Sequence, residues 1–266
     1  MSKIHWILQN NLIKSEIKES IIKTLKKSSI SYEEVQVIPF SDSLPVIEQY
    51  GDQYVFYGSS TLIFNAYKHS IYQKGVFYDE NTFTINNYNK QWGKKMLNND
   101  AIITSLANFS NGNYDVNSLW FIRPVSDSKA FSGAVMRFSE IQSFTQNLKE
   151  SNNPHLSTET PIAVSLPKEI EKEWRHFIVN KKVISSSRYA QHGDLSISNT
   201  DIPKELINFV ENCCLEYTPH SIFVMDTALC NGKYFIIECN CFNGTGFYDH
   251  DIEAIIQSVN QFLSSC

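Results

Sequence analysis

SIFVMDTALCNGKYFIIECNCFNGTGFY, residues 221–248, is the stretch of sequence that decides the fold. It contains two β-rich runs, FVMDTAL and YFIIECN. Between them stands Asn231-Gly232, a dipeptide that favours a tight hairpin turn. The two runs are therefore predicted to pair as antiparallel strands.

Three oxygen-bearing side chains lie on these strands. Glu238 and Asn240 are two positions apart, so both project to the same face, because successive strand side chains alternate. From the position of the turn, Asp226 is expected roughly opposite residues 233–235, and its carboxylate approaches the other two side chains across neighbouring rungs. Converging oxygen ligands of this kind indicate magnesium, bound together with a nucleotide.

The composition is that of an ordinary globular protein, since the 266 residues are 42% hydrophobic and 19% charged. A net charge of −5 gives no general attraction to nucleic acid or to anionic membranes. No run approaches the roughly 18 apolar residues that a membrane helix needs. The start, MSKIHWILQNN, lacks a signal-peptide cleavage site. We therefore expect a cytoplasmic protein.

The cysteines and histidines form no recognisable disulfide or zinc pattern. All six cysteines fall in the last quarter of the chain without a C-x-x-C pair, so we interpret them as reduced thiols. The seven histidines are scattered and form no H-E-x-x-H or H-x₃-H arrangement. A histidine-based metal site is not expected.

The N-terminal part alternates strand-like and helix-like segments, which is typical of a small open α/β domain. Apolar residues at helical spacing predict a helix across residues 13–25. The strand-like segments are residues 4–8, 32–39 and 53–60.

Residues 79–99 are polar and rich in asparagine, as expected of a connecting region. We therefore place the domain boundary near residue 95. The predicted domains are residues 1–95 and residues 96–266.

Gly58-Ser59-Ser60 follows the last of these N-terminal strands and precedes a helix-like segment. Such a turn can bind phosphate at a helix N-terminus. One glycine without G-x-G-x-x-G or G-K-[ST] favours a plain strand-to-helix turn, and both interpretations stay open.

A short polar segment further along has the composition of a phosphate-binding loop. Residues 126–133, SDSKAFSG, stand between the strand-like runs LWFIRPV and AVMRF. Small residues let backbone N–H groups approach oxygen anions closely, and Arg123 and Lys129 supply positive charge. A surface hairpin with two ordinary basic residues is the alternative.

The rest of the second domain is predicted to contain strands, a helix, strands and a helix, which is an α+β arrangement. EWRHFIV and KKVISSSRY are predicted to form a hairpin, with Glu173, Arg175 and Phe177 on one face. A face that carries glutamate and arginine either meets solvent or needs a partner or ligand. Apolar periodicity predicts helices at residues 203–217 and 251–263.

This order of features resembles the ATP-grasp superfamily, in particular the small ATP-grasp proteins of bacteria and phages, over roughly residues 118–250. The resemblance rests on D…E-x-N, here Asp226, Glu238 and Asn240, and on the glycine-containing loop at residues 242–247. It implies an ATP-grasp fold, in which two α+β subdomains hold ATP between them, preceded by a small α/β domain. It also implies that the three residues bind the Mg²⁺ ions that bridge the nucleotide phosphates.

Other positions are compared with the family one at a time. The resemblance assigns Arg123 and Lys129 to the phosphates, although an arginine stands where the family usually has a lysine. Glu173 resembles the residue near the ribose, with Glu169 and Glu171 as competitors. The linker that holds adenine by its backbone resembles Ala163, Val164, Ser165 and Leu166.

The resemblance also implies which basic residues act on the transferred phosphoryl group. Arg188 resembles the residue that reaches this group, with Arg175 as a second candidate and Lys129 as a further contributor. An arginine often found two residues before the metal-binding aspartate is absent, because Val224 stands there.

The implied function is an ATP-dependent carboxylate-amine (or thiol) ligase that acts through an acylphosphate. ATP and Mg²⁺ are the expected cofactors, a small-molecule or peptide carboxylate and an amine the expected substrates, and no nucleic acid is expected. Phosphoryl transfer needs positioning and charge neutralisation more than covalent help. The absence of a Ser-His-Asp or Cys-His set agrees with this. A phosphotransferase and a non-catalytic nucleotide-binding module are the alternatives.

Overall fold

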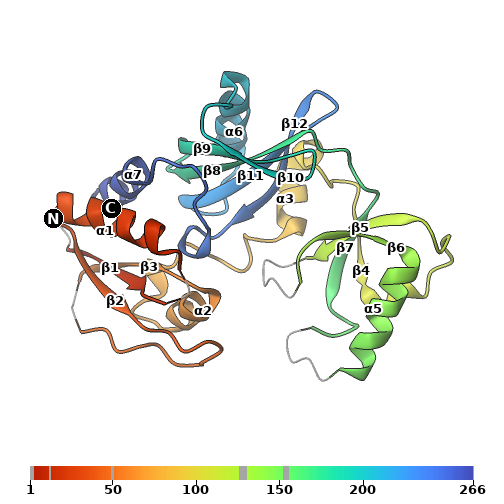
Figure 1. Cartoon of the computed structure of the whole chain (residues 1–266), viewed down its shortest axis with the longest axis horizontal. Coiled ribbons are helices and arrows are strands. Elements are labelled where there is room, and N and C mark those ends of the chain that lie inside the picture. Colours follow the sequence, from red (N-terminus) through yellow and green to blue (C-terminus); the bar gives the residue numbers. More distant parts are fainter. Residues whose placement is uncertain (1–2, 12, 49–50, 126–130, 152–155, 266) are drawn as a thin grey trace.

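The computed structural model describes residues 3–11, 13–48, 51–125, 131–151 and 156–265. Their strands form three separate sheets, so the mixed α+β class predicted from the sequence is confirmed (Figure 1). The two ends of the chain lie close together beside the N-terminal sheet (Figure 1). No helix in this described part of the chain has the length and apolar character that crossing a membrane requires.

The N-terminal sheet is parallel and has the order β2-β1-β3. Helix α1 (Ser15–Lys27) packs on one face and α2 (Ser60–Lys68) on the other. The central strand is buried along its whole length because both faces are covered, as is usual for parallel sheets. The strands are β1 (Ile4–Gln9), β2 (Ser31–Val35) and β3 (Gln53–Tyr57).

The middle sheet is antiparallel, with the order β10-β9-β8-β11-β12. Both predicted hairpins are present, and positive φ angles at Asn180 and Lys181 and at Asn231 and Gly232 match the tight turns that two-residue hairpin loops require. The strands are β8 (Lys172–Val179), β9 (Lys182–Gln191), β10 (Asp194–Ser198), β11 (Ile222–Cys230) and β12 (Lys233–Asn240).

One face of this sheet packs on α6 (Lys204–Glu216) and α3 (Ile85–Trp92). The helix α3 lies in the polar segment that we expected only to connect the domains. It forms because Phe83, Tyr88 and Trp92 are buried against the sheet, which outweighs the polar character of the surrounding asparagines. Two short 3₁₀ turns flank it, η1 (Gln73–Gly75) and η2 (Gly93–Lys95).

The third sheet has the order β4-β7-β5-β6, and its helices cover one face only. Its opposite face is directed toward the middle sheet (Figure 1). Its elements are β4 (Ile102–Ser105), α4 (Leu106–Ser110), β5 (Leu119–Pro124), β6 (Ala134–Arg137), α5 (Phe138–Glu150) and β7 (Pro161–Ser165).

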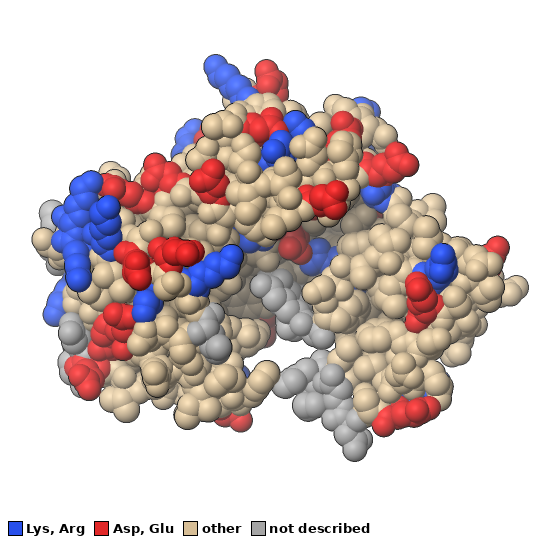
Figure 2. All heavy atoms as spheres, in the orientation of Figure 1, with Lys and Arg blue, Asp and Glu red and all other residues tan. Residues whose placement is uncertain are grey.

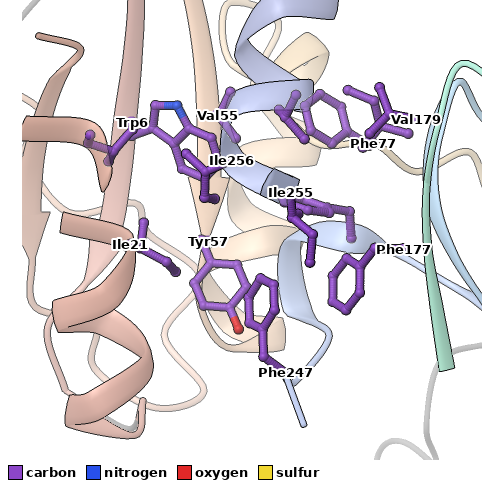
Figure 3. Close-up of a cluster of buried hydrophobic side chains, with 14 of the residues drawn as sticks. Trp6, Ile21, Val55, Tyr57, Phe77, Phe177, Val179, Phe247, Ile255 and Ile256 are labelled. Atoms are coloured by element: carbon purple, nitrogen blue, oxygen red, sulfur yellow. The ribbon is translucent and has the colours of Figure 1, made fainter. Parts of the chain in front are cut away.

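After β12 the chain forms η3 (Phe242–Gly244) and returns to the N-terminal sheet through α7 (Ile252–Ser264). Trp6 Nε1 donates to Asn260 Oδ1 at 2.8 Å inside a core to which α1, α7 and β8 all contribute (Figure 3). The last helix therefore joins the middle sheet to the N-terminal one. The domain boundary near residue 95 stays a prediction.

Candidate functional site

Asp226 and Glu238 are direct partners in the ladder between β11 and β12. Our expectation that Asp226 lies opposite residues 233–235 is wrong. From the turn the pairs run regularly to Thr227 with Ile236, and the register then shifts by one residue, so Asp226 pairs with Glu238 instead of Ile237. Because the side-chain period is two, this bulge brings both carboxylates to the same face.

Asn240 connects the two carboxylates. Its Nδ2 donates to Asp226 Oδ2 and to Glu238 Oε1, both at 3.2 Å. Asn240 is 4% exposed and Asp226 2%, so the group is largely screened from water. The structure therefore brings together the three residues that we predicted to bind magnesium.

Arg175, on the neighbouring strand β8, holds Asp226 with a two-point contact. Its Nε lies 2.9 Å from Oδ1 and its Nη2 2.7 Å from Oδ2, and its Nη1 donates to the carbonyl of Gly246 at 3.2 Å. Burial by itself lowers the pKa of Arg175, but the attraction and hydrogen bonds of Asp226 outweigh it, so the pKa is raised. This guanidinium is permanently charged and fixed in direction.

Two tyrosine rings also contact Arg175. The rings of Tyr189 and Tyr248 stack with their centroids 5.2 Å apart, and the Arg175 Cζ lies 5.8 and 5.1 Å from the respective centroids. Tyr189 donates to Glu173 Oε2 at 2.8 Å. We did not predict Tyr189, because no motif marks it.

A second ion pair joins the middle and third sheets. Arg123 Nη2, from β5, lies 2.7 Å from Glu238 Oε2, from β12. The two side chains are 14% and 25% exposed. The predicted phosphate-binding arginine thus reaches the predicted metal ligands from the opposite wall.

A cleft of about 320 Å³ lies between these walls, which is at the lower end of the range for small-molecule sites. Figure 2 shows the surface hollowed between the lobe of β4–β7 and α5 and the rest of the molecule. Burial raises the pKa of Glu173 in this cleft, and the hydrogen bond from Tyr189 opposes the effect. The cleft is lined by Phe121, Arg123, Pro124, Phe131, Ser132, Gly133, Glu173, Tyr189, Ile237 and Glu238.

Arg188 lies on the other face of the middle sheet, away from the carboxylates. It pairs across the ladder with Trp174, and its guanidinium contacts Asp201 and donates to the carbonyl and hydroxyl of Ser196. The physical reason is a register shift between Phe177 and Ile178, which moves every later residue of β9 by one position. Of the two arginine candidates, Arg175 alone is brought to the cleft.

The predicted nucleotide-binding positions fall in three places. Lys129 lies outside the described residues. Ala163 and Val164 stand inside β7, whose backbone groups pair with β4 and β5 on its two sides, whereas Leu166 follows the strand and is 59% exposed. Ser165, at the end of β7, is buried and donates to Asn98 Oδ1 at 3.2 Å.

The three glutamates proposed for the ribose are separated by the structure. Glu173 lines the cleft. Glu171 Oε1 accepts from the backbone N–H of Gly232 at the hairpin turn, and Glu169 is exposed. This placement favours Glu173 over its two competitors.

The donor set at the cleft fits magnesium. Mg²⁺ takes a few protein oxygens and completes its shell with waters and phosphate oxygens, and Asp226, Glu238 and Asn240 offer two carboxylates and an amide. Two guanidinium groups already balance negative charge here. In the described ranges, no three or more histidine, cysteine, aspartate or glutamate side chains are placed to hold a metal ion, so Asn240 has to contribute.

A second hollow, of about 290 Å³, lies beside β2. Its lining includes Glu33, Glu34 and Glu48. Three carboxylates would repel the phosphates of a nucleotide, which leaves the cleft between the sheets as the candidate nucleotide site.

Comparison with known proteins agrees with this geometry. The model of an ATP-grasp domain family, the second family of its clade, matches residues 100–258. A comparison with curated proteins finds no match. Similar solved structures include the D-alanine–D-alanine ligase from Bacillus anthracis, with 13% identity over 97% of this chain and 91% of that chain and a TM-score of 0.57.

Two further similar structures contain peptides. One is the ATP-grasp ligase PsnB complexed with its minimal precursor, Mg and ADP (10% identity, 92% of this chain, 90% of that chain, TM-score 0.55). The other is the macrocyclase MdnC from Microcystis aeruginosa MRC bound with the precursor peptide MdnA (10% identity, 97% of this chain, 99% of that chain, TM-score 0.56). At these identities the similarity shows a common fold.

Proposed function

The chain belongs to this ATP-grasp domain family, and from this we propose that it is an ATP-dependent ligase that joins a carboxylate to an amine. One observation carries the proposal: two carboxylates, an amide and two guanidinium groups meet at a cleft between two sheets. The similar structures named above are ligases and a macrocyclase, which supports ligation as the reaction class.

Asp226, Glu238 and Asn240 would hold Mg²⁺, whose charge offsets that of the nucleotide phosphates when it is bound. Arg123 contacts this group from β5, and with Lys129 it would bind the phosphates. Glu173 would accept hydrogen bonds from the ribose, and the residues at the end of β7 would contact adenine. These roles agree with the position of Arg123 and Glu173 on the wall of the cleft.

The proposed reaction has two steps. An oxygen of the substrate carboxylate attacks the γ-phosphorus of ATP, and the bond to the bridging oxygen breaks, which releases ADP. An amine or thiol then attacks the acyl carbon, phosphate leaves with its oxygen, and the nucleophile loses a proton. Both steps develop negative charge, which a fixed cation stabilises.

Arg175 is the residue that we propose for this charge stabilisation. Asp226, the Gly246 carbonyl and two rings fix its direction. It comes from β8, the strand beside the one on which Val224 replaces the arginine often found in the family. Arg175 would therefore supply the missing positive charge from the neighbouring strand.

We propose amino acids or peptides as the substrates. The PsnB and MdnC structures contain precursor peptides, and the Bacillus anthracis enzyme is a ligase of D-alanine. The five described cysteines are all free, which agrees with the cytoplasm as the proposed compartment.

The test is a screen of ADP and phosphate release with Mg²⁺ and ATP across amino acids and short peptides. Release that depends on both an acid and an amine is expected. A phosphorylated product formed without an amine would instead indicate a phosphotransferase. ATP binding without turnover under any combination would indicate a non-catalytic module.

Glu238→Gln provides the matched test of the site. It removes one charged oxygen ligand at a side chain that is only partly buried, so turnover is expected to be lost while the protein stays folded. Glu211→Gln, the same change on α6 at the contact with Lys182, is the control and should keep full activity. Unchanged turnover in Glu238→Gln would contradict the proposed site.

A further inference from the structure

The carboxyl edge of the N-terminal sheet contains a crevice that the proposed function does not use. The strand order is β2-β1-β3, and the chain leaves β1 for α1 on one face and β3 for α2 on the other. The connections after β1 and β3 therefore diverge. In open α/β sheets, ligands bind outside the carboxyl ends of the strands at such a switch point.

Gln9 and Ser59 occupy this switch point. Gln9 is the last residue of β1 and is fully buried, and its Oε1 accepts from the backbone N–H of Ser59 at 2.7 Å. The carboxamide thus lies against the first turn of α2. Its Nε2 is buried without a hydrogen-bond partner.

Ser59 is the N-cap of α2, yet its side chain does not cap the helix. Its Oγ is a second buried atom without a partner. Buried polar groups are satisfied in the great majority of cases, so two neighbouring unsatisfied donors call for an explanation. A helix N-terminus adds the positive end of the helix dipole and no acidic residue stands in the first turn of α2.

The backbone is shaped to keep Gln9 in this place. A Cβ on Gly58 would lie 2.7 Å from Gln9 Oε1, so any other residue there would displace the carboxamide. The N–H of Gly58 donates to the carbonyl of Asn243 at 3.0 Å, three residues beyond Asn240. The crevice therefore borders the loop that leaves the proposed magnesium ligands.

We propose that Gln9 Nε2, Ser59 Oγ and the N-terminus of α2 bind a carboxylate group of the ligase substrate. Its place in ligation rests on the proposed function above. The two side-chain donors are neutral, which matches a singly charged carboxylate better than a doubly charged phosphate. The exposed Ser60 marks the side from which a ligand enters.

The experiment is a titration followed by NMR of the glutamine side-chain amides, without ATP. The probes are N-acetylglycine, its uncharged amide and inorganic phosphate. The Gln9 signal, identified by its absence in Gln9→Glu, should move saturably with N-acetylglycine and stay in place with the amide. Tighter binding of phosphate, or equal shifts with the amide, would overturn the proposal.

Ser59→Ala tests the site without the risk of unfolding, since the Ser59 hydroxyl makes no hydrogen bond. It should weaken N-acetylglycine binding about tenfold, as expected for one hydrogen bond to a charged group. Ser20→Ala, an exposed hydroxyl on α1, is the control. Because the titration omits ATP, a failed ADP-release screen with retained probe binding refutes the ligase alone. An immobile Gln9 signal refutes the subsite alone.

Discussion

The guanidinium of Arg175 grips both carboxylate oxygens of Asp226, at 2.7 and 2.9 Å, across adjacent strands of the middle sheet. Asp226 has little other access to water, since its side chain is 3% exposed. In such a place, a charge that loses its partner costs far more than the pair contributes as a whole. The pair therefore matters for stability as well as for the proposed chemistry.

Arg175→Ala should lower the free energy of unfolding by about 3 kcal/mol, because it leaves the Asp226 carboxylate buried and unpaired. The double variant Arg175→Ala/Asp226→Ala should be destabilised by clearly less than the sum of the two single variants. Urea unfolding of all four proteins measures this coupling. Additive effects would show that the two-point contact contributes little.

Arg123→Gln should weaken the binding of MgATP about tenfold, as expected for loss of one charge-assisted contact. Arg188→Gln should leave this affinity unchanged, because Arg188 lies on the opposite face with Asp201 and Ser196. Calorimetry of nucleotide binding compares the two. Weaker ATP binding in Arg188→Gln would mean that the other face of the sheet also influences the cleft.

The element order and the fold class could be predicted from the sequence because each depends on local signals. Asn231-Gly232 announces one hairpin, and E-x-N places Glu238 and Asn240 on one face by simple alternation. Apolar periodicity likewise located α6 and α7 to within a residue or two. These signals are independent of which strand pairs with which.

Strand register could not be predicted, because one extra residue in a ladder leaves no mark in the hydrophobic pattern. The shift beside Asp226 brings it opposite Glu238, and the shift beside Phe177 turns Arg188 away from the cleft. The same chemistry-bearing residues are thus gathered or separated by bulges. Tyr189 was missed for the same reason, since only the final register shows that it reaches Glu173.

Asn243→Ala should destabilise the protein by about 3 kcal/mol or more, because three buried backbone groups lose their partners. The Asn243 side chain donates to the carbonyls of Phe56 and Gly75 at 2.6 and 2.8 Å and accepts from the Phe77 N–H at 2.7 Å. Thermal unfolding measures the loss. The same substitution at the exposed Asn117 is the control and should have little effect.

Stability should fall as the pH is lowered from 6.5, because burial lowers the pKa of His176 and of His250 to about 3 in each case. The His176 ring contacts the hydroxyls of Ser186 and Thr227, and it is neutral. The unfolded chain binds protons at both histidines near pH 6.5 and the folded protein does not. Each histidine therefore removes about 1.4 kcal/mol per pH unit across this window.

Glu173 acts in the opposite direction, since its pKa is raised in the folded protein and its contribution is lost as the pH rises above 4.5. Urea unfolding between pH 6.5 and pH 4.5 should show a net loss of stability on acidification, because two histidines outweigh one glutamate. His176→Gln should make this dependence shallower by about the share of one proton, whereas substitution of the exposed His192 should not. An unchanged slope in His176→Gln would show that His176 takes up its proton without unfolding.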